Sequence, residues 1–270
     1  MRRRRDPAFD ASEHVFGRRH KRVRAWDVPG IVDTGDDPGS EDGPPVFVLV
    51  HGLGVSSDLF RAVTDRLRHL GRVVVFDLPG FGGVPHPRDP LSIPEFARGI
   101  DAALQELGVV RPVLVGHSMG AQVVVELARR EPHLRGRMVL VAPVVHVDQR
   151  RLSKVLTGFA RSAVHERFGA ALVSVRGYLS AGLRWPLELL PAMVRYPIED
   201  RIADLGGRLV IVRGEHDLLC PPQWAERLLN RSGAEGSIIV AEGAAHQVVV
   251  DNADEVVAAA IAVSGRGPLP

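Results

Sequence analysis

The sequence contains a single cysteine, Cys220, so an intramolecular disulfide is excluded. It also lacks any stretch that approaches the roughly 20 consecutive apolar residues of a membrane-spanning helix. After the basic first residues, Asp6, Asp10 and Glu13 stand where a secretory signal would need an apolar run. These absences predict a protein without disulfides, export signal or membrane span, and we expect it to be cytoplasmic.

A strong excess of one charge is also missing, because 34 Lys and Arg residues are balanced by 32 Asp and Glu residues. The one dense basic region lies within residues 2–24. No nucleic-acid-binding motif accompanies it, and a charge run without such a motif is typical of a solvated tail. We therefore expect no nucleic-acid partner.

Short apolar runs separated by helix-length segments dominate what is present. Hydrophobic residues make up 45% and charged residues 24% of the chain, as in an ordinary soluble α/β protein. The expected strands cover residues 46–50, 73–76, 113–115, 138–141, 209–212 and 238–240. The expected helices cover residues 58–70, 92–107, 120–130, 223–230 and 253–263, and Ser92 and Glu95 form a capping-box pair. This alternation predicts an α/β fold with a mostly parallel sheet flanked by helices.

One long segment does not follow the alternation of strands and helices. Residues 144–205 have a mostly helical pattern between two expected strands, which predicts a helical cap inserted into the core. The core itself is expected to comprise residues 45–143 and 206–270. Residues 1–44 are expected to form a basic tail and irregular edge strands, because Pro29 and Gly30 interrupt the strand pattern.

The strongest chemical signal is the run Gly116-His117-Ser118-Met119-Gly120, which lies directly after an expected strand and directly before an expected helix. A turn this sharp forces the central residue into a strained backbone conformation and needs small residues on either side. In that context the serine oxygen projects above the edge of the sheet. The pattern predicts Ser118 as a nucleophile.

A serine hydroxyl is not nucleophilic at neutral pH unless a base accepts its proton. His246 follows the last expected strand and fits the general base, and Asp217 follows the preceding strand and fits the acid that orients the histidine. The order Ser, Asp, His along the chain is that of a nucleophile-elbow hydrolase. Asp148, on an earlier loop, is the reserve candidate for the acid.

Carbonyl attack also needs two backbone donors for the oxyanion that forms. The run His51-Gly52-Leu53-Gly54 follows the strand at 46–50, and we expect the N–H groups of Leu53 and Met119 to form the oxyanion hole. His51 is expected to anchor this loop by hydrogen bonds rather than to act in catalysis. Cys220 is expected to be a buried, apolar residue.

These motifs, together with Asp77-Leu78-Pro79-Gly80-Phe81-Gly82 and Gly214-Glu215-His216-Asp217, resemble the α/β-hydrolase family, specifically its esterase, thioesterase and C–C hydrolase branch. The resemblance spans residue 45 to the C-terminus. It implies an eight-stranded, mostly parallel sheet, a cap over the active site, and neither a metal nor an organic cofactor. The haloalkane dehalogenases and epoxide hydrolases of this family carry an aspartate nucleophile where this chain has Ser118, so their chemistries are disfavoured.

The expected function is hydrolysis of an ester or related acyl bond through an acyl-enzyme. The alternatives are a C–C bond hydrolase, a cofactor-free haloperoxidase-like enzyme, or a ligand-binding receptor with a vestigial triad. Bulky residues crowd the expected cap and favour an apolar acyl substrate, but they also fit burial against the core or a homodimer interface. They are Phe159, Phe168, Tyr178, Leu183, Trp185, Leu187, Leu190, Met193 and Tyr196.

Overall fold

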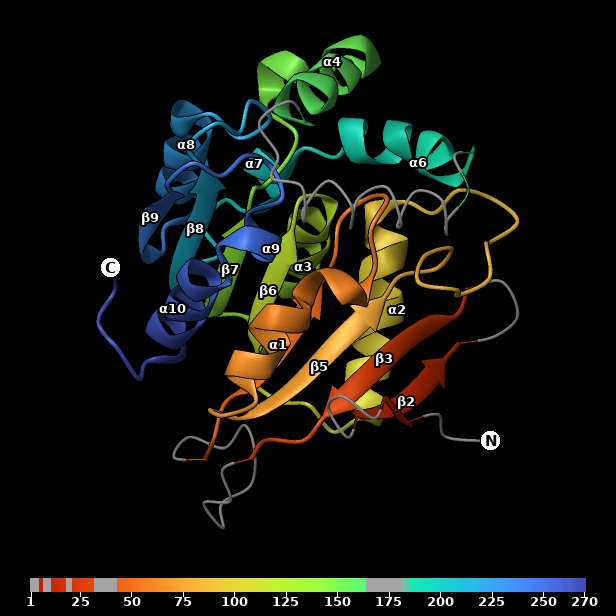
Figure 1. Ribbon diagram of the computed structural model, residues 1–270, viewed down its shortest axis with the longest axis vertical. Helices are drawn as coiled ribbons and strands as arrows, with labels where there is room; N and C mark the ends of the chain where they lie inside the picture. The colour runs from red at the N-terminus through yellow and green to blue at the C-terminus, as the bar shows by residue number, and fades with distance from the viewer. Residues whose placement is uncertain (1–4, 7–10, 18–20, 32–42, 164–181, 183) are drawn as a thin grey trace.

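The computed structural model describes residues 5–6, 11–17, 21–31, 43–163, 182 and 184–270. Of the bulky residues expected in the cap, Phe168, Tyr178 and Leu183 lie outside these ranges. The described part of the chain forms one twisted sheet with helices on both faces (Figure 1).

The sheet has the order β1-β2-β3-β5-β4-β6-β7-β8-β9. Its strands are β1 (Arg5–Asp6), β2 (Ala11–Phe16), β3 (Val23–Val28), β4 (Val46–Val50), β5 (Arg72–Asp77), β6 (Val113–His117), β7 (Arg137–Val141), β8 (Arg208–Gly214) and β9 (Glu235–Ala241). Strands β4 to β9 pair in parallel, and β1 to β3 add antiparallel pairs at one edge. The eight strands that the resemblance implies are β2 to β9, and β1 extends their edge by two residues.

The N-terminal strands are more regular than the sequence predicts. Strand β3 pairs with β5 from Arg24 to Val28, and Pro29 and Gly30 follow β3 instead of interrupting it. A proline just past the end of a strand removes no ladder hydrogen bond. Pro29 and Gly30 therefore mark where β3 ends, and β2 and β3 are regular six-residue strands.

Two apolar cores cover the two faces of the sheet, as the alternation along β4 shows. Val46, Val48 and Val50 belong to one core, and Phe47 and Leu49 belong to the other. Helices α2 (Ile93–Glu106), α3 (Met119–Arg130) and α8 (Pro222–Ser232) pack on the first face. Helices η1 (Ser57–Phe60), α1 (Arg61–Leu67), α9 (Val248–Asp251) and α10 (Ala253–Ser264) pack on the second. The predicted capping box is confirmed, since the Ser92 side chain accepts the backbone N–H of Glu95 and the Glu95 carboxylate accepts the backbone N–H of Ser92.

Between β7 and β8 lies a segment of residues 144–205, here called the β7–β8 segment. Its described helices are η3 (Val147–Gln149), α4 (Leu152–Ala163), α6 (Arg184–Arg195) and α7 (Ile198–Arg201). Helices α4 and α6 lie together at one end of the molecule, beyond the main layers (Figure 1). Trp185 of α6 donates its indole N–H to the carbonyl oxygen of Pro79 over 3.2 Å, and Gly80 lies so close that a Cβ there would be 2.1 Å from the indole nitrogen.

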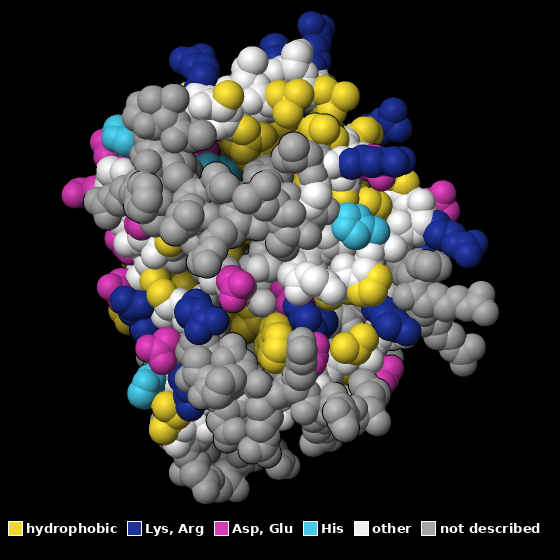
Figure 2. Space-filling view, turned by 45° about the vertical axis from the view of Figure 1, so that its right-hand side comes forward, with side chains coloured by type: hydrophobic (Ala, Val, Ile, Leu, Met, Phe, Trp, Pro, Cys, Tyr) yellow, Lys and Arg dark blue, Asp and Glu magenta, His cyan; other side chains and the backbone are white. Residues whose placement is uncertain are grey.

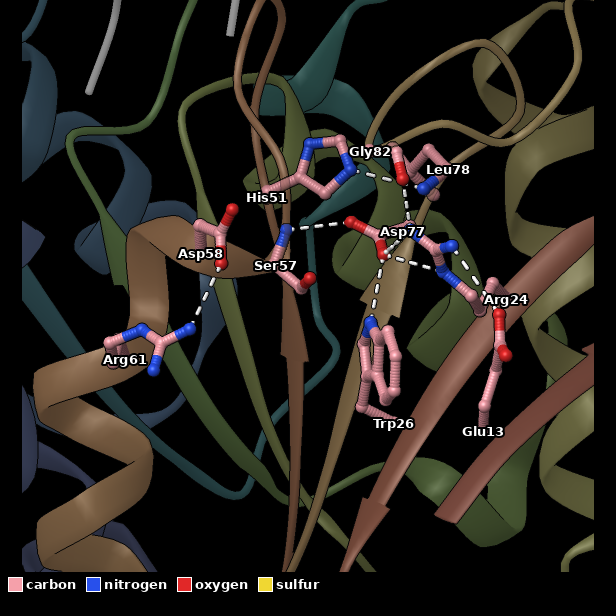
Figure 3. Close-up of polar contacts among 10 residues, drawn as sticks. All are labelled: Glu13, Arg24, Trp26, His51, Ser57, Asp58, Arg61, Asp77, Leu78 and Gly82. Atoms are coloured by element: carbon pink, nitrogen blue, oxygen red, sulfur yellow. Dashed lines mark hydrogen bonds and ion pairs between the residues drawn. The ribbon is translucent and has the colours of Figure 1, made fainter. Parts of the chain in front are cut away.

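A buried carboxylate connects the antiparallel edge to the parallel strands (Figure 3). The Asp77 side chain is completely buried at the end of β5, and its Oδ2 accepts hydrogen bonds from Arg24 over 2.9 and 2.7 Å and from Trp26 over 3.0 Å. Its Oδ1 accepts the backbone N–H of Ser57 over 2.7 Å. The network therefore fixes the loop after β4 against the loop after β5.

We expect Asp77→Ala to lower the free energy of unfolding by about 3–5 kcal/mol, because it leaves the charge of Arg24 without its buried partner. Asp58→Ala is the matched control. Asp58 also pairs with an arginine, Arg61, at 3.5 Å, but both side chains are more than half exposed, so its loss should cost less than about 1 kcal/mol. Urea unfolding of both variants tests this, and equal effects would contradict it.

Candidate active site

Ser118 occupies a tight turn between the carboxyl end of β6 and the first residue of α3. Its backbone lies at φ 55° and ψ −118°, which residues other than glycine rarely adopt. A Cβ on Gly116 would lie 2.4 Å from the carbonyl oxygen of Gly120, and one on Gly120 would lie 2.1 Å from that of Val50. Only glycines fit these two positions, so the turn and its strained serine depend on them.

The three residues expected to act together meet in the structure. His246 Nε2 lies 2.9 Å from Ser118 Oγ, and His246 Nδ1 lies 3.0 Å from Asp217 Oδ2. His246 comes from the loop after β9 and Asp217 from the loop after β8. All three residues are at most 3% exposed, so these contacts lie in a region of low dielectric.

Asp217 is held in its charged form. Burial alone would raise the pKa of its carboxyl group, but interaction with His246 and hydrogen bonds from His246, Leu219 and Cys220 outweigh burial and lower the pKa below its ordinary value. Asp217 Oδ1 accepts the N–H groups of Leu219 over 2.9 Å and Cys220 over 3.3 Å. One oxygen is thus fixed by the backbone, and the other faces His246.

Asp148, the reserve candidate, lies elsewhere. It follows β7 in η3, its side chain is 81% exposed, and its Oδ2 lies 3.8 Å from Nδ1 of His146. The carboxylate in contact with His246 Nδ1 is that of Asp217.

The loop after β4 lies directly beside Ser118. A Cβ on Gly52 would be 2.8 Å from Ser118 Cβ, and the next residue, Leu53, is 6% exposed. Met119 is fully buried and is the first residue of α3, where a backbone N–H has no partner within the helix. Both residues expected to donate to an oxyanion therefore lie next to the serine.

His51 anchors this loop as expected. It is completely buried, and its Nε2 accepts the N–H of Leu78 over 3.0 Å (Figure 3). Its Nδ1 lies 2.7 Å from the carbonyl oxygen of Gly52. Burial lowers the pKa of His51 below its ordinary value, although the charge of Asp77 opposes this shift. A neutral imidazole supplies both the acceptor for Leu78 and a donor for Gly52.

Two further residues contact His246, and the sequence predicts neither contact. The His117 ring is 1% exposed, and its Nε2 lies 3.1 Å from the carbonyl oxygen of His246. Phe159 of α4 packs its edge against the His246 ring, with ring centroids 5.3 Å apart. His117 could have been singled out by its place directly before Ser118, whereas nothing in the sequence pairs Phe159 with a residue 87 positions later.

Cys220 is free and completely buried, and burial raises the pKa of its thiol well above the ordinary value. Within the described ranges, no three His, Cys, Asp or Glu side chains are grouped so that they could hold a metal ion. No helix in the same ranges is long and apolar enough to cross a membrane.

Residues 47–260 match the model of the alpha/beta hydrolase family. The chain is 32% identical over 229 residues to the biotin biosynthesis bifunctional protein BioHC of Cellvibrio japonicus, covering 76% of this chain and 44% of that protein. It is 36% identical over 125 residues to the sn-1-specific diacylglycerol lipase ABHD11 of Xenopus tropicalis, covering 44% of this chain and 39% of the lipase. The chain thus spans less than half the length of these curated relatives.

Solved structures share the architecture at low identity. The enol-lactonase of Burkholderia xenovorans superposes with a TM-score of 0.70 at 17% identity, over 91% of this chain and 97% of that chain. A hydrolase of Pseudomonas aeruginosa superposes with a TM-score of 0.72 at 18% identity, over 94% and 98% of the two chains. At such identities the likeness establishes the fold alone.

The two fully buried histidines should make the fold sensitive to acid. Burial lowers the pKa of both His51 and His117 from 6.5, and that of His117 falls to about 3. Below pH 6.5 the unfolded chain therefore binds protons that the folded chain does not, so stability falls as the pH falls toward 3. For His117 the expected slope approaches about 1.4 kcal/mol per pH unit below pH 6.5, and His51 adds to it in the same direction.

Urea unfolding at pH 7, 6 and 5 measures this decline in the free energy of unfolding. His117→Gln removes one of the two titrating groups and should make the slope smaller. A free energy of unfolding that stays constant over this range in the unaltered protein would contradict the assignment of two neutral, buried histidines.

Proposed function

Because the chain belongs to the alpha/beta hydrolase family, we propose that it is a serine hydrolase that cleaves an ester or related acyl bond, with Ser118 as nucleophile. The observation that carries the proposal is the unbroken chain of contacts from Ser118 Oγ through His246 to Asp217. An ordinary buried histidine would not need a carboxylate on one nitrogen and a strained serine on the other.

The proposed reaction has two halves. Ser118 Oγ attacks the carbonyl carbon while His246 Nε2 takes the hydroxyl proton, and the tetrahedral intermediate then expels the alcohol, which receives that proton. The product of this half is an acyl-enzyme on Ser118. Water attacks it with His246 again acting as base, and the carboxylic acid leaves as Ser118 recovers its proton.

Asp217 orients the base in this scheme. Its carboxylate holds the proton on His246 Nδ1, which leaves the Nε2 lone pair directed at Ser118, and its negative charge stabilises the imidazolium that forms. The N–H groups of Leu53 and Met119 are proposed to bind the oxyanion, because both belong to backbone packed beside Ser118.

The β7–β8 segment is proposed to act as a cap whose apolar side chains line the substrate site. Some of its bulky residues are buried, among them Trp185, Leu190 and Met193. Leu152, Leu156 and Leu187 are 46–56% exposed, and Figure 2 shows hydrophobic side chains gathered near the end of the molecule where α4 and α6 lie. The names of similar proteins, a diacylglycerol lipase and an enol-lactonase among them, favour carboxylic esters as the substrate class.

Ser118→Ala should remove nearly all turnover of p-nitrophenyl esters while the fold stays intact, since the hydroxyl contributes chemistry and the turn is held by glycines. Turnover and thermal melting of the two proteins test this. A variant that kept more than about a tenth of the original kcat would argue against Ser118 as nucleophile. No turnover by the unaltered protein would instead favour a ligand-binding protein.

Asp217→Asn should lower kcat by about 100-fold or more, because the amide no longer holds the correct tautomer of His246. Asp148→Asn is the matched control and should change kcat little, since its side chain faces solvent. Steady-state kinetics with the same ester decide the matter. The reverse result would move the acid to the loop after β7.

Esters of increasing acyl length test the apolar cap. If apolar residues line the acyl site, each added methylene should improve kcat/KM by up to about 0.8 kcal/mol of transition-state binding until the site is full. We expect an optimum at medium chain length in a series from acetyl to decanoyl esters. A steady fall from acetyl onwards would exclude an apolar acyl site and leave the bulky residues a packing role.

A further inference from the structure

The imidazole ring of His117 lies where three catalytic loops meet. It belongs to the nucleophile turn as the residue before Ser118, and its Nε2 lies 3.1 Å from the backbone carbonyl oxygen of His246. A Cβ on Gly52, in the loop after β4, would lie 3.3 Å from its Nδ1. The loops that carry the nucleophile, the base and the expected oxyanion donor Leu53 are therefore all packed around one buried side chain.

The contact with His246 fixes the tautomer of His117. A carbonyl oxygen only accepts hydrogen bonds, so His117 Nε2 must carry the proton and donate it. Nδ1 is then a bare lone pair, and it is buried without a hydrogen-bond partner within the described part of the chain. The ring is thus held in place by one directional hydrogen bond, which is the one to the base residue.

Two other anchors of the base loop come from the loop after β8. Gly243 N–H donates to Glu215 over 2.9 Å, and the carbonyl oxygen of Ala244 accepts the N–H of His216 over 2.9 Å. Both partners lie in the loop after β8. The hydrogen bond from His117 instead comes from the nucleophile turn, and its acceptor is the backbone carbonyl of His246 itself.

We infer that His117 is a positioning residue, whose Nε2–H bond to the His246 carbonyl sets the distance between the base and Ser118 Oγ. The inference rests on the proposed function, because it concerns the geometry of that catalytic pair. Proton transfer is steeply sensitive to such geometry, and a misplacement of about 1 Å costs on the order of 100-fold in rate.

Burial supports this role, because it keeps the ring uncharged. It lowers the pKa of His117 to about 3, and the neighbouring His246 contributes in the same direction. A charged His117 would place a second, unpaired N–H beside Gly52 and would oppose the positive charge that His246 gains in each half-reaction. His117 therefore remains a neutral donor while His246 accepts and returns the proton of the proposed reaction.

Two variants of similar size distinguish the effect of the hydrogen-bond donor of His117 from the effect of its packing. In His117→Gln the side-chain amide nitrogen stands as many bonds from Cβ as Nε2 does, so a donor is retained. His117→Met has comparable length and no donor. The probe is a fluorophosphonate that labels the nucleophilic serine. Labelling rates are measured at increasing probe concentration, which gives two separate quantities: the rate at saturation and the probe concentration at half saturation.

We expect His117→Met to lower the saturating rate by about 10- to 100-fold with the half-saturating concentration unchanged, and His117→Gln to recover the rate to within about fivefold of the unaltered protein. Trp224→Phe is the stability control. It removes a different buried hydrogen bond, from the indole to the carbonyl oxygen of Pro143 at 3.0 Å, and should label at the original rate even if its melting temperature falls.

Equal labelling rates in His117→Met and the unaltered protein would overturn the inference, and so would equal losses in the Met and Gln variants. If His117→Met does not fold, His117→Asn replaces it. The amide nitrogen of the Asn variant stands at the place of Nδ1 and does not reach the His246 carbonyl, so this variant should be labelled as slowly as is expected for His117→Met. Labelling as fast as that of His117→Gln would overturn the inference. Failure of the unaltered protein to label, with Ser118→Ala as the blank, would instead contradict the proposed function.

Discussion

The structure of the site depends on one steric constraint, the turn that holds Ser118 at φ 55° between β6 and α3. The turn exists only because the backbone of Gly120 approaches the end of β4 and Gly116 approaches Gly120, at distances that exclude any Cβ. These approaches bring α3 down onto the sheet and place the serine within reach of loops from three other strands. Parallel strands end at the same edge, so the loops after β4, β8 and β9 supply the remaining groups.

Two buried carboxylates near this turn, those of Asp77 and Asp217, have different kinds of partner. Asp77 is paired with Arg24 and accepts hydrogen bonds from Trp26 and the Ser57 backbone, so its role is structural. Asp217 accepts backbone N–H groups on one oxygen, and its other oxygen faces His246. A carboxylate whose partner is a titratable imidazole can respond when that imidazole gains a proton, which an arginine partner does not allow.

Helix α3 links the nucleophile turn to the β7–β8 segment. Gln122 donates to the carbonyl oxygen of Met193 over 2.9 Å, and Glu126 accepts the hydroxyl of Tyr196 over 2.9 Å. Both residues are buried on the helix that begins directly after Ser118. The element that positions the serine therefore also holds the C-terminal end of α6, by hydrogen bonds to Met193 and Tyr196.

The sequence alone determined the six parallel strands, the position of Ser118 and the loops of His246 and Asp217, because apolar runs and glycine turns are local patterns that report local structure. It left Asp148 open as the acid, because both aspartates follow a strand and the sequence pattern does not distinguish their loops. Only the three-dimensional paths of the loops bring Asp217 to His246. It also missed the pairing of β3 with β5 and the contact of His117 with His246, which join residues about 50 and 129 positions apart. Such long-range contacts leave no periodicity in the chain, so only the tertiary structure decided them.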